Sequence, residues 1–361
     1  MSEQLWLNAA QAVIRAGMLP MPLTETILEL VKTILTEDQA RFIPVFSGPM
    51  NRDQIKAKSG KDGRELDTML ESLMDGGVIT GTRSKGSGTM VYRLMGPFPG
   101  LFEFTMMRGG TGEKEKRQAR LFDRLFNELA GMVHDNYDQI IEAMRVFPPV
   151  ARVVPLDAVV DRDREAVLPT EEVIRIVEKF DAIAVTTCYC RHEKELLGEP
   201  CRVTREKNNC LMFGKIAQFA MEHNFARPIS KEDALRVLSE SAEAGLVHKA
   251  FHVNLDPDRE EEAICNCCKC CCGTFQMYYK GAAPLHNLSS FMASVAEDAC
   301  SGCGLCEEKC PMEAITITDG IAAVMENRCI GCGVCASQCP QDAIHMQKTG
   351  LRKVFLPPKR A

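Results

Sequence analysis

The stretches "CSGCGLCEEKCP" (residues 300–311) and "CIGCGVCASQCP" (residues 329–340) repeat one spacing of cysteines. In each stretch four cysteines are separated by two, two and three residues, and a proline follows the last one. The sequences that come next, "MEAITIT" and "QDAIHMQ", are also alike, which indicates a duplicated unit. Two-residue gaps let three thiolates surround three corners of one iron–sulfur cluster, and the glycines in the gaps allow the tight backbone that this requires.

Zinc is the alternative ligand for such a pattern. A structural zinc ion is satisfied by two cysteine pairs. It would explain neither the third cysteine of each run, nor the three-residue gap, the proline or the duplication. The spacing therefore favours iron–sulfur clusters.

Over residues 299–347 the chain resembles the bacterial 2[4Fe-4S] ferredoxins, and all eight cysteine positions match. In this family the fourth cysteine of each run binds the other cluster. The resemblance implies a ferredoxin-like fold and clusters that pass single electrons without a substrate pocket. It assigns the ligands of one cluster as Cys300, Cys303, Cys306 and Cys339, and those of the other as Cys329, Cys332, Cys335 and Cys310.

Composition restricts the class of protein further. The chain has 361 residues, of which 45% are hydrophobic and 25% charged, as expected for a soluble globular protein with more than one domain. Its net charge of -6 argues against a dedicated nucleic-acid binder. Neither a secretory signal nor a membrane span is predicted. We therefore expect a cytoplasmic location, where 18 cysteines are more suited to binding metal than to forming disulfides.

Ten cysteines lie outside the duplicated unit, and six of them fall in "ICNCCKCCCGTF" (residues 264–275). Neighbouring side chains of an extended segment point to opposite sides. We therefore predict that this segment forms a wall between two clusters, with two alternating frames of three cysteines. Each frame would take its fourth ligand from an earlier group, so that one or two further clusters are expected. The frames are Cys265, Cys268 and Cys271, and Cys267, Cys270 and Cys272; the earlier group is Cys188, Cys190, Cys201 and Cys210.

Two alternatives remain for this region. The earlier four cysteines could by themselves hold a single additional cluster. The triplet Cys271-Cys272-Gly273 resembles the CCG motif of heterodisulfide-reductase catalytic subunits, although only one such triplet is present. That resemblance leaves open a reductase with a substrate-binding cluster in residues 188–272.

The first half of the chain contains no cysteine before residue 188. Residues 51–95 predict a short helix, a glycine-containing turn, a longer helix and two strands. This order resembles a winged helix-turn-helix domain over about residues 20–96. The longer helix, residues 63–75, has four acidic side chains and one cation, a poor match to a phosphate-lined groove. We therefore expect a docking module, with a redox-sensing transcriptional regulator as the alternative.

The fold class predicted from these patterns is α+β. Residues 23–35 and 113–144 predict helices, and residues 151–160 and 181–190 predict strands around a helix at 168–180. A helix beginning after Ser230 and ending at Gly245 leads into a strand toward Cys265. The expected domains are a winged-helix-like domain (1–96), a linker and amphipathic helix (97–150), a Cys-rich αβ iron–sulfur domain (151–290), a 2[4Fe-4S] ferredoxin domain (291–347) and a basic tail (348–361).

The function predicted from the sequence is electron transfer through several [4Fe-4S] clusters. The chain would be a ferredoxin-like subunit or carrier that serves an oxidoreductase complex of anaerobic metabolism. Its partners would be redox proteins, namely a low-potential donor and an acceptor oxidoreductase. No side chain is nominated as catalytic, because the cysteines account for the chemistry.

Overall fold

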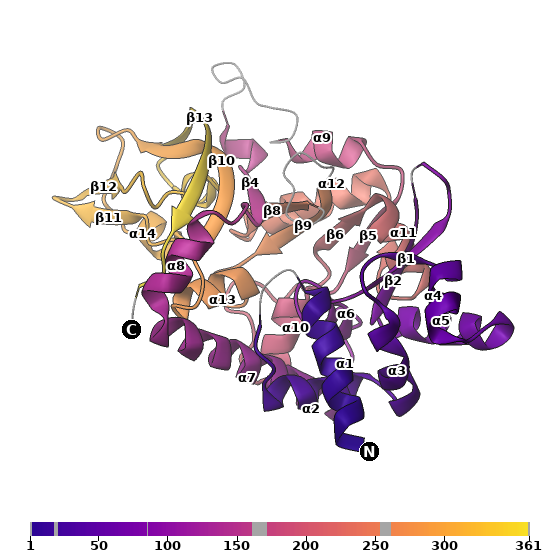
Figure 1. Ribbon diagram of the computed structural model, residues 1–361. Coiled ribbons are helices and arrows are strands. Elements are labelled where there is room, and N and C mark those ends of the chain that lie inside the picture. The colour runs from indigo at the N-terminus through magenta and orange to yellow at the C-terminus, as the bar shows by residue number, and fades with distance from the viewer. Residues whose placement is uncertain (1, 18–20, 85, 161–171, 253–260, 360–361) are drawn as a thin grey trace. The chain divides into compact units, whose positions relative to one another are not determined.

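The computed structural model describes residues 2–17, 21–84, 86–160, 172–252 and 261–359 (Figure 1). The chain divides into two compact units. The N-terminal unit consists of residues 1–127, 186–200 and 215–228. The C-terminal unit consists of residues 128–185, 201–214 and 229–361.

The N-terminal unit is mainly helical. It has a small antiparallel sheet in the order β1-β3-β2, in which Ile79 of β2 faces Leu94 of β3. Its strands are β1 (Met50–Asn51), β2 (Ile79–Arg83), β3 (Met90–Leu94) and β7 (Arg227–Pro228). Its helices are α1 (Ser2–Ala16), α2 (Glu25–Ile34), α3 (Glu37–Phe42), the short η1 (Ile43–Val45), α4 (Arg52–Ser59), α5 (Gly63–Asp75), α6 (Leu101–Met106), most of α7 (Glu113–Asp135), α10 (Tyr189–Leu196) and α11 (Gly214–Glu222).

The order of elements expected for residues 51–95 is found as α4, α5, β2 and β3. Helix α4 begins with a capping box, in which the Asn51 side chain accepts from the Gln54 backbone N–H and the Gln54 side chain accepts from the Asn51 N–H. Gly60 ends the helix in the left-handed conformation. In α5 the apolar face is buried, with Leu66 and Leu73 fully inaccessible. The helical spacing of apolar residues could predict α5 because the same face of the helix packs into the core of the unit.

The long helix expected over residues 113–144 is divided. Helix α7 ends at Asp135, and α8 (Tyr137–Arg145) begins after Asn136, whose φ of -121° and ψ of 28° are not helical. The Asn136 side-chain amide donates to the Met132 carbonyl at 3.0 Å. The Met132 carbonyl also accepts from the Asn136 backbone N–H at 3.2 Å, so the hydrogen-bond ladder reaches Asn136 and the helix is interrupted by the dihedral angles of this residue.

The C-terminal unit is built on a twisted sheet, in which seven strands follow one another as β13-β10-β4-β8-β9-β6-β5. The strands are β4 (Ala151–Val154), β5 (Ile183–Thr186), β6 (Cys210–Phe213), β8 (Val247–His252), β9 (Glu261–Cys267), β10 (Leu285–Val295) and β13 (Ile344–Leu356), with β11 (Ile315–Thr318) and β12 (Ile321–Val324) as a separate hairpin. The helices are α8, the short η2 (Asp157–Val159), α9 (Val173–Glu178), α12 (Lys231–Glu243), α13 (Gly273–Tyr279), α14 (Leu305–Lys309) and α15 (Val334–Ser337).

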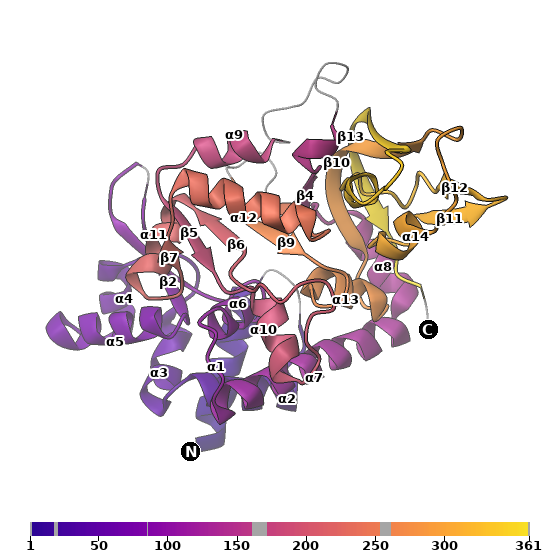
Figure 2. The ribbon, with the colours of Figure 1, turned by 180° about the vertical axis from the view of Figure 1, so that it is seen from behind.

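Helices α9 and α12 cover one face of this sheet, as Figure 2 shows. Ile176 of α9 and Leu238 of α12 belong to one buried cluster with Leu211 of β6 and Ile264 of β9. Ser230 caps α12, and Gly245 follows it with a φ of +76°, as expected. The start of the helix predicted at 168–180 lies outside the described residues.

Strands β10 and β13 form a long antiparallel pair that encloses the duplicated cysteine runs in sequence. Leu285 faces Leu356 at one end of the pair, and Val295 faces Ile344 at the other. Strand β10 therefore crosses residue 290, and residues 348–356 are part of β13 instead of the tail expected there. The sequence did not reveal this because the basic residues of "KTGLRK" obscure the alternation of β13, whose inward positions Val354 and Leu356 are buried.

Among the helices of the described residues, none has the length and the apolar character needed to cross a membrane.

Candidate metal centres

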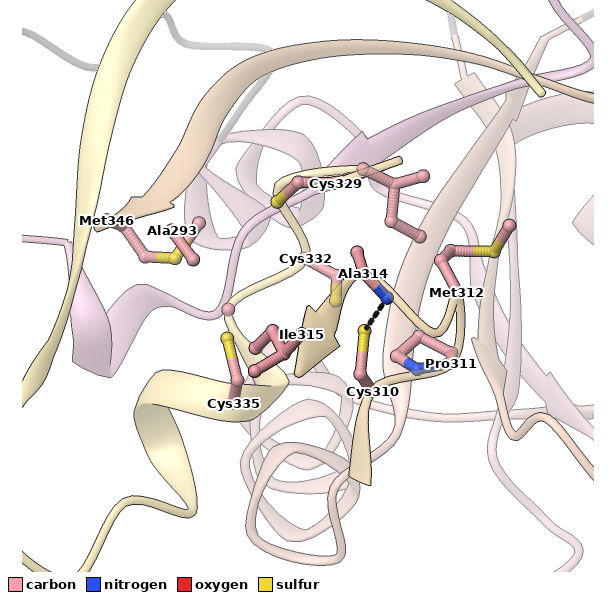
Figure 3. Close-up of a pocket in the computed structure, with 12 residues that line it drawn as sticks. Ala293, Cys310, Pro311, Met312, Ala314, Ile315, Cys329, Cys332, Cys335 and Met346 are labelled. Atoms are coloured by element: carbon pink, nitrogen blue, oxygen red, sulfur yellow. Dashed lines mark hydrogen bonds between the residues drawn. The ribbon is translucent and has the colours of Figure 1, made fainter. Parts of the chain in front are cut away.

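The first three cysteines of the second run and the last cysteine of the first run surround one pocket (Figure 3). Helix α14 ends just before Cys310, α15 contains Cys335, and Cys329 and Cys332 lie in the loop before α15. All four cysteines are buried. Apolar side chains complete the pocket, including Ala293, Ile315, Ile330 and Met346. The sulfur atoms thus line a largely apolar space, which suits an iron–sulfur cluster.

Burial makes free thiolates unfavourable in this pocket. It raises the pKa of Cys332 to about 12 and also raises the pKa of Cys335. A cationic metal centre compensates such a cost, so deprotonation and metal binding are coupled here. The backbone N–H of Ala314 donates to the Cys310 sulfur at 3.3 Å, a contact that stabilises negative charge on sulfur.

The cysteine loops need glycine at two equivalent positions. Gly302 and Gly331 have φ values of +64° and +68°. A Cβ at Gly302 would lie 2.1 Å from the Gly320 carbonyl oxygen, and one at Gly331 would lie 2.1 Å from that of Phe291. Only glycine fits both the left-handed backbone and these close approaches.

The first cysteine run is more open. Cys303 is exposed and Cys300 partly exposed, whereas Cys306 is buried. Burial raises the pKa of Cys306, and the negative charges of Cys303 and Cys300 raise it further. Cys339 follows α15, which packs against α14.

The two runs also share their hydrogen bonds to sulfur. Ala314 donates to Cys310 at 3.3 Å, and Ala343, at the equivalent position of the second run, donates to Cys339 at 3.4 Å. In addition, the backbone N–H of Ala322 donates to the Cys300 sulfur at 3.4 Å. The duplication seen in the sequence is therefore a duplication of local structure as well.

With this geometry in view, comparison with known families gives one match. Residues 293–346 match the family model described as a 4Fe-4S dicluster domain. No match was found among curated proteins or among solved structures. This part of the chain is therefore a 4Fe-4S dicluster domain, and the donor set described above fits such clusters.

A second group of four cysteines, which we call the close quartet, consists of Cys201, Cys268, Cys270 and Cys271. All four sulfur atoms lie within 4.8 Å of one another. Cys201 is 3.6 Å from both Cys268 and Cys270, and Cys270 is 3.6 Å from both Cys268 and Cys271. Leu246 and the partly buried Ala244 pack against the group.

Contacts between the thiols alter their acidity. Hydrogen bonds from Cys268, Cys270 and Cys271 lower the pKa of Cys201. Contact with Cys201 raises the pKa of Cys270, but hydrogen bonds from Cys268 and Cys271 outweigh this effect, and its pKa falls to about 6. The same contacts raise the pKa of Cys271, so within the close quartet they favour the thiolate at Cys201 and Cys270 and the thiol at Cys271.

The predicted frames of the six-cysteine segment are not the groups that the structure brings together. Strand β9 ends at Cys267, and the chain then turns, with the Cys272 N–H donating to the Cys268 carbonyl at 3.1 Å. This turn places Cys268, Cys270 and Cys271 on one side, so members of both frames meet. The alternation that we assumed requires an extended chain, and the chain is extended only as far as Cys267.

The cysteines at the end of β9 form a separate group. The sulfur atoms of Cys267 and Cys272 are 3.3 Å apart, and Cys272 is 3.2 Å from the Thr274 hydroxyl oxygen. The pKa of Cys267 is raised mainly by its hydrogen bond with Cys272, and burial raises it further. Cys265 lies opposite Lys249 in the sheet, and Cys210 begins β6.

Sequence reasoning missed Lys249, which is fully buried beside these thiols. Its ammonium group donates to the Thr274 hydroxyl at 3.0 Å and lies 3.8 Å from the centre of the Phe275 ring. It also lowers the pKa of Cys267 by its charge. The only available signal was a lysine in the middle of the stretch "VHKAFH", which is predicted as a strand.

Cys188 and Cys190 lie in the N-terminal unit, whereas the other sixteen cysteines lie in the C-terminal unit. Cys188 is the N-cap residue of α10, and Cys190 lies in the first turn of that helix. Both are buried. The neighbouring His192 ring is 2.7 Å from the Gly110 carbonyl oxygen, so that nitrogen is occupied by the backbone.

Proposed function

We propose that the chain is an electron-transfer protein that works as a ferredoxin-like subunit or carrier for an oxidoreductase complex of anaerobic metabolism. Its dicluster domain would hold two [4Fe-4S] clusters. When bound, they would accept and release single electrons. The observation that carries the proposal is the set of four buried cysteine sulfurs around one apolar pocket in a domain that matches the dicluster family.

Cross-ligation is supported by the position of Cys310. It belongs to the first run in sequence, but it lines the pocket together with Cys329, Cys332 and Cys335 of the second. By the duplicated geometry, Cys339 would complete the site of Cys300, Cys303 and Cys306. Packing of α14 against α15 supports this exchange, because each helix leads directly into the cysteine that serves the other site.

The two sites would have different roles in electron transfer. The site of the first run includes the exposed Cys303, whereas the other site is buried. Electrons would therefore enter or leave at the first run, where a redox partner can approach closely. Of the ten further cysteines, those outside the close quartet remain candidates for additional clusters.

The charges of the N-terminal unit support docking in preference to DNA binding. Of the four cations of α4 and the following turn, three are paired with acids of the same region, and Lys58 donates to the Ser47 hydroxyl. Arg52 bonds to Asp67 at 2.7 Å and Lys56 to Asp62 at 2.6 Å, and Lys61 pairs with Glu65. These partly or fully exposed pairs contribute little to stability, but they reduce the positive potential that phosphates require.

The proposal is tested by counting iron and acid-labile sulfide in anaerobically purified protein and by recording EPR spectra after dithionite reduction. We expect at least about eight iron and eight sulfide per chain, in two interacting reduced clusters. Fewer than about four iron would contradict the proposal. Salt-sensitive, sequence-selective retardation of genomic DNA fragments would favour the regulator, and turnover of a small substrate without a protein partner would favour the reductase.

A further inference from the structure

The close quartet differs from the dicluster sites in the spacing of its sulfur atoms. Four of its six sulfur–sulfur distances are 3.6 Å. The remaining two are no longer than 4.8 Å. Cys310, Cys329, Cys332 and Cys335 do not form such a tight group, and among the described residues the close quartet is the only all-cysteine one.

This spacing has a direct geometric meaning. In a regular tetrahedron the edge is about 1.63 times the distance from centre to corner. With a zinc–sulfur bond of about 2.3 Å, the sulfur atoms lie about 3.8 Å apart. In a cubane each thiolate binds a different iron atom, so the ligand sulfurs must be separated by a whole cluster edge in addition to their own bonds. The observed 3.6 Å fits one ion and leaves no room for four irons.

We propose that Cys201, Cys268, Cys270 and Cys271 bind a single thiophilic divalent metal ion, with Zn²⁺ the expected one, in a tetrahedral all-thiolate site. Tetrahedral coordination by four sulfurs is typical of zinc and of iron. All four positions are taken by protein ligands, which is the closed arrangement of a structural ion. The site would replace one of the further clusters predicted from the sequence.

The surroundings of the quartet suit a structural ion. Backbone N–H groups approach the sulfur atoms, as at Val203, which donates to the Cys201 sulfur at 3.4 Å. Such bonds offset the net negative charge that four thiolates around a divalent ion would have. Leu246 and Ala244 cover the group with apolar surface. The segment after Cys201, residues 202–209, has neither helix nor strand, so the ion would fix this segment to the turn that follows β9.

The Cys267–Cys272 pair lies outside this site and provides a matched control. Cys272 is adjacent to Cys271 in sequence and equally buried, but its sulfur contacts Cys267 instead of the quartet. A substitution there removes a buried thiol from the same turn without removing a proposed ligand. The two substitutions therefore separate a metal-binding role from a general effect on the fold.

The test compares zinc, iron and acid-labile sulfide per chain in the full-length protein and in Cys201→Ala and Cys272→Ala. We expect about one zinc ion in the unmodified protein, its loss in Cys201→Ala with iron and sulfide unchanged, and its retention in Cys272→Ala. Loss of a single ion without sulfide supports the site whether that ion is zinc or iron. Loss of about four iron and four sulfide in Cys201→Ala would overturn it, as would metal contents that are unchanged.

Because Cys201→Ala could prevent folding, the unmodified protein supplies an independent readout. X-ray absorption at the zinc edge should give four sulfur neighbours at about 2.3 Å. Zinc with nitrogen or oxygen neighbours would overturn the assignment. Since the eight irons of the dicluster domain are counted separately, failure of this inference and failure of the proposed function give different results.

Discussion

The two cysteine quartets of the C-terminal unit use the same ligand in different geometries. Around the pocket of Cys310, Cys329, Cys332 and Cys335 the sulfurs are carried by separate elements and spread over a cavity. In the close quartet three of the cysteines come from one four-residue turn, and all four sulfur atoms lie within 4.8 Å of one another. The number of cysteines therefore does not determine the metal centre. What decides it is whether the backbone holds the thiolates apart or folds them together.

The largest effect that separates the quartets is the loss of a complete cluster. Cys332→Ala removes a proposed ligand from the buried pocket, where its neighbours Cys335 and Cys310 have pKa values raised by burial and cannot readily be left as unpaired thiolates. We expect this variant to lose about four iron and four sulfide per chain, and the EPR signal of one reduced cluster. Iron and sulfide analysis with EPR checks the result. An iron content equal to that of the unmodified protein would mean that Cys332 is not a ligand.

Removing one ligand from the close quartet should instead act on stability. The ion would cross-link positions that are 67 residues apart in sequence. By the loop-closure estimate for a covalent link of this span, its loss costs about 4 kcal/mol. We expect Cys201→Ala to unfold at a lower denaturant concentration, measured by circular dichroism, while the visible absorption of the clusters persists in the native protein.

Val203→Ala is the matched control for this loop. Val203 is 42% exposed, and its contact with Cys201 is made through the backbone N–H, which alanine keeps. Its stability should stay within about 0.5 kcal/mol of the unmodified protein. If the two substitutions destabilise the protein equally, the cross-link does not exist.

Replacing a glycine that has a positive φ should have a smaller effect on the stability of the dicluster domain. In Gly331→Ala the new methyl group would meet the Phe291 carbonyl at 2.1 Å, whereas in Gly304→Ala it would meet nothing within 4 Å. Both residues have positive φ, so both substitutions carry a conformational cost of about 1–2 kcal/mol. We expect Gly331→Ala to lose a further 1–3 kcal/mol, roughly, through steric conflict and to incorporate less iron. Equal iron contents in the two variants would contradict this account.

The sequence was sufficient to predict those features that depend on the spacing of nearby residues. The cysteine runs of residues 300–340 identified the dicluster domain because their cysteines are separated by characteristic gaps of two and three residues. Ser230 likewise located the start of α12, since capping depends on neighbours within three residues. These predictions needed no knowledge of long-range contacts.

The composition of the close quartet could not be predicted, because it depends on contacts between residues that are far apart in the sequence. Nothing in "CNCCKCCC" indicates that the strand ends at Cys267, so two frames seemed possible where the chain in fact turns. Cys201 joins that turn across 67 residues, and Lys249 is brought beside the same segment by strand pairing. The winged-helix likeness of the first half remains a prediction from the order of its elements.

The last prediction concerns the N-terminal unit. It gives a change in stability that does not depend on metal, with which the variants of the two cysteine quartets can be compared. Glu103 lies in the first turn of α6, and its carboxylate accepts a hydrogen bond from the Gly100 backbone N–H at 2.5 Å. Burial raises its pKa from 4.5 to about 7 despite that hydrogen bond. The folded protein therefore keeps a proton on Glu103 over a pH range in which the unfolded chain has lost it.

The sign of the pH dependence follows from this difference. The contribution of Glu103 to stability is fully present below about pH 4.5 and is lost as the pH rises through about 7. Glu103→Gln keeps an oxygen that can accept from Gly100 but cannot ionise. We expect it to be more stable than the unmodified protein by about 1–3 kcal/mol at pH 8, and nearly equal to it at pH 5.

Denaturant unfolding at the two pH values measures this difference in stability. A difference that is the same at both would show that the carboxyl group does not titrate in this range. A difference that disappears when the metals are removed would show that the N-terminal unit depends on the cysteine centres.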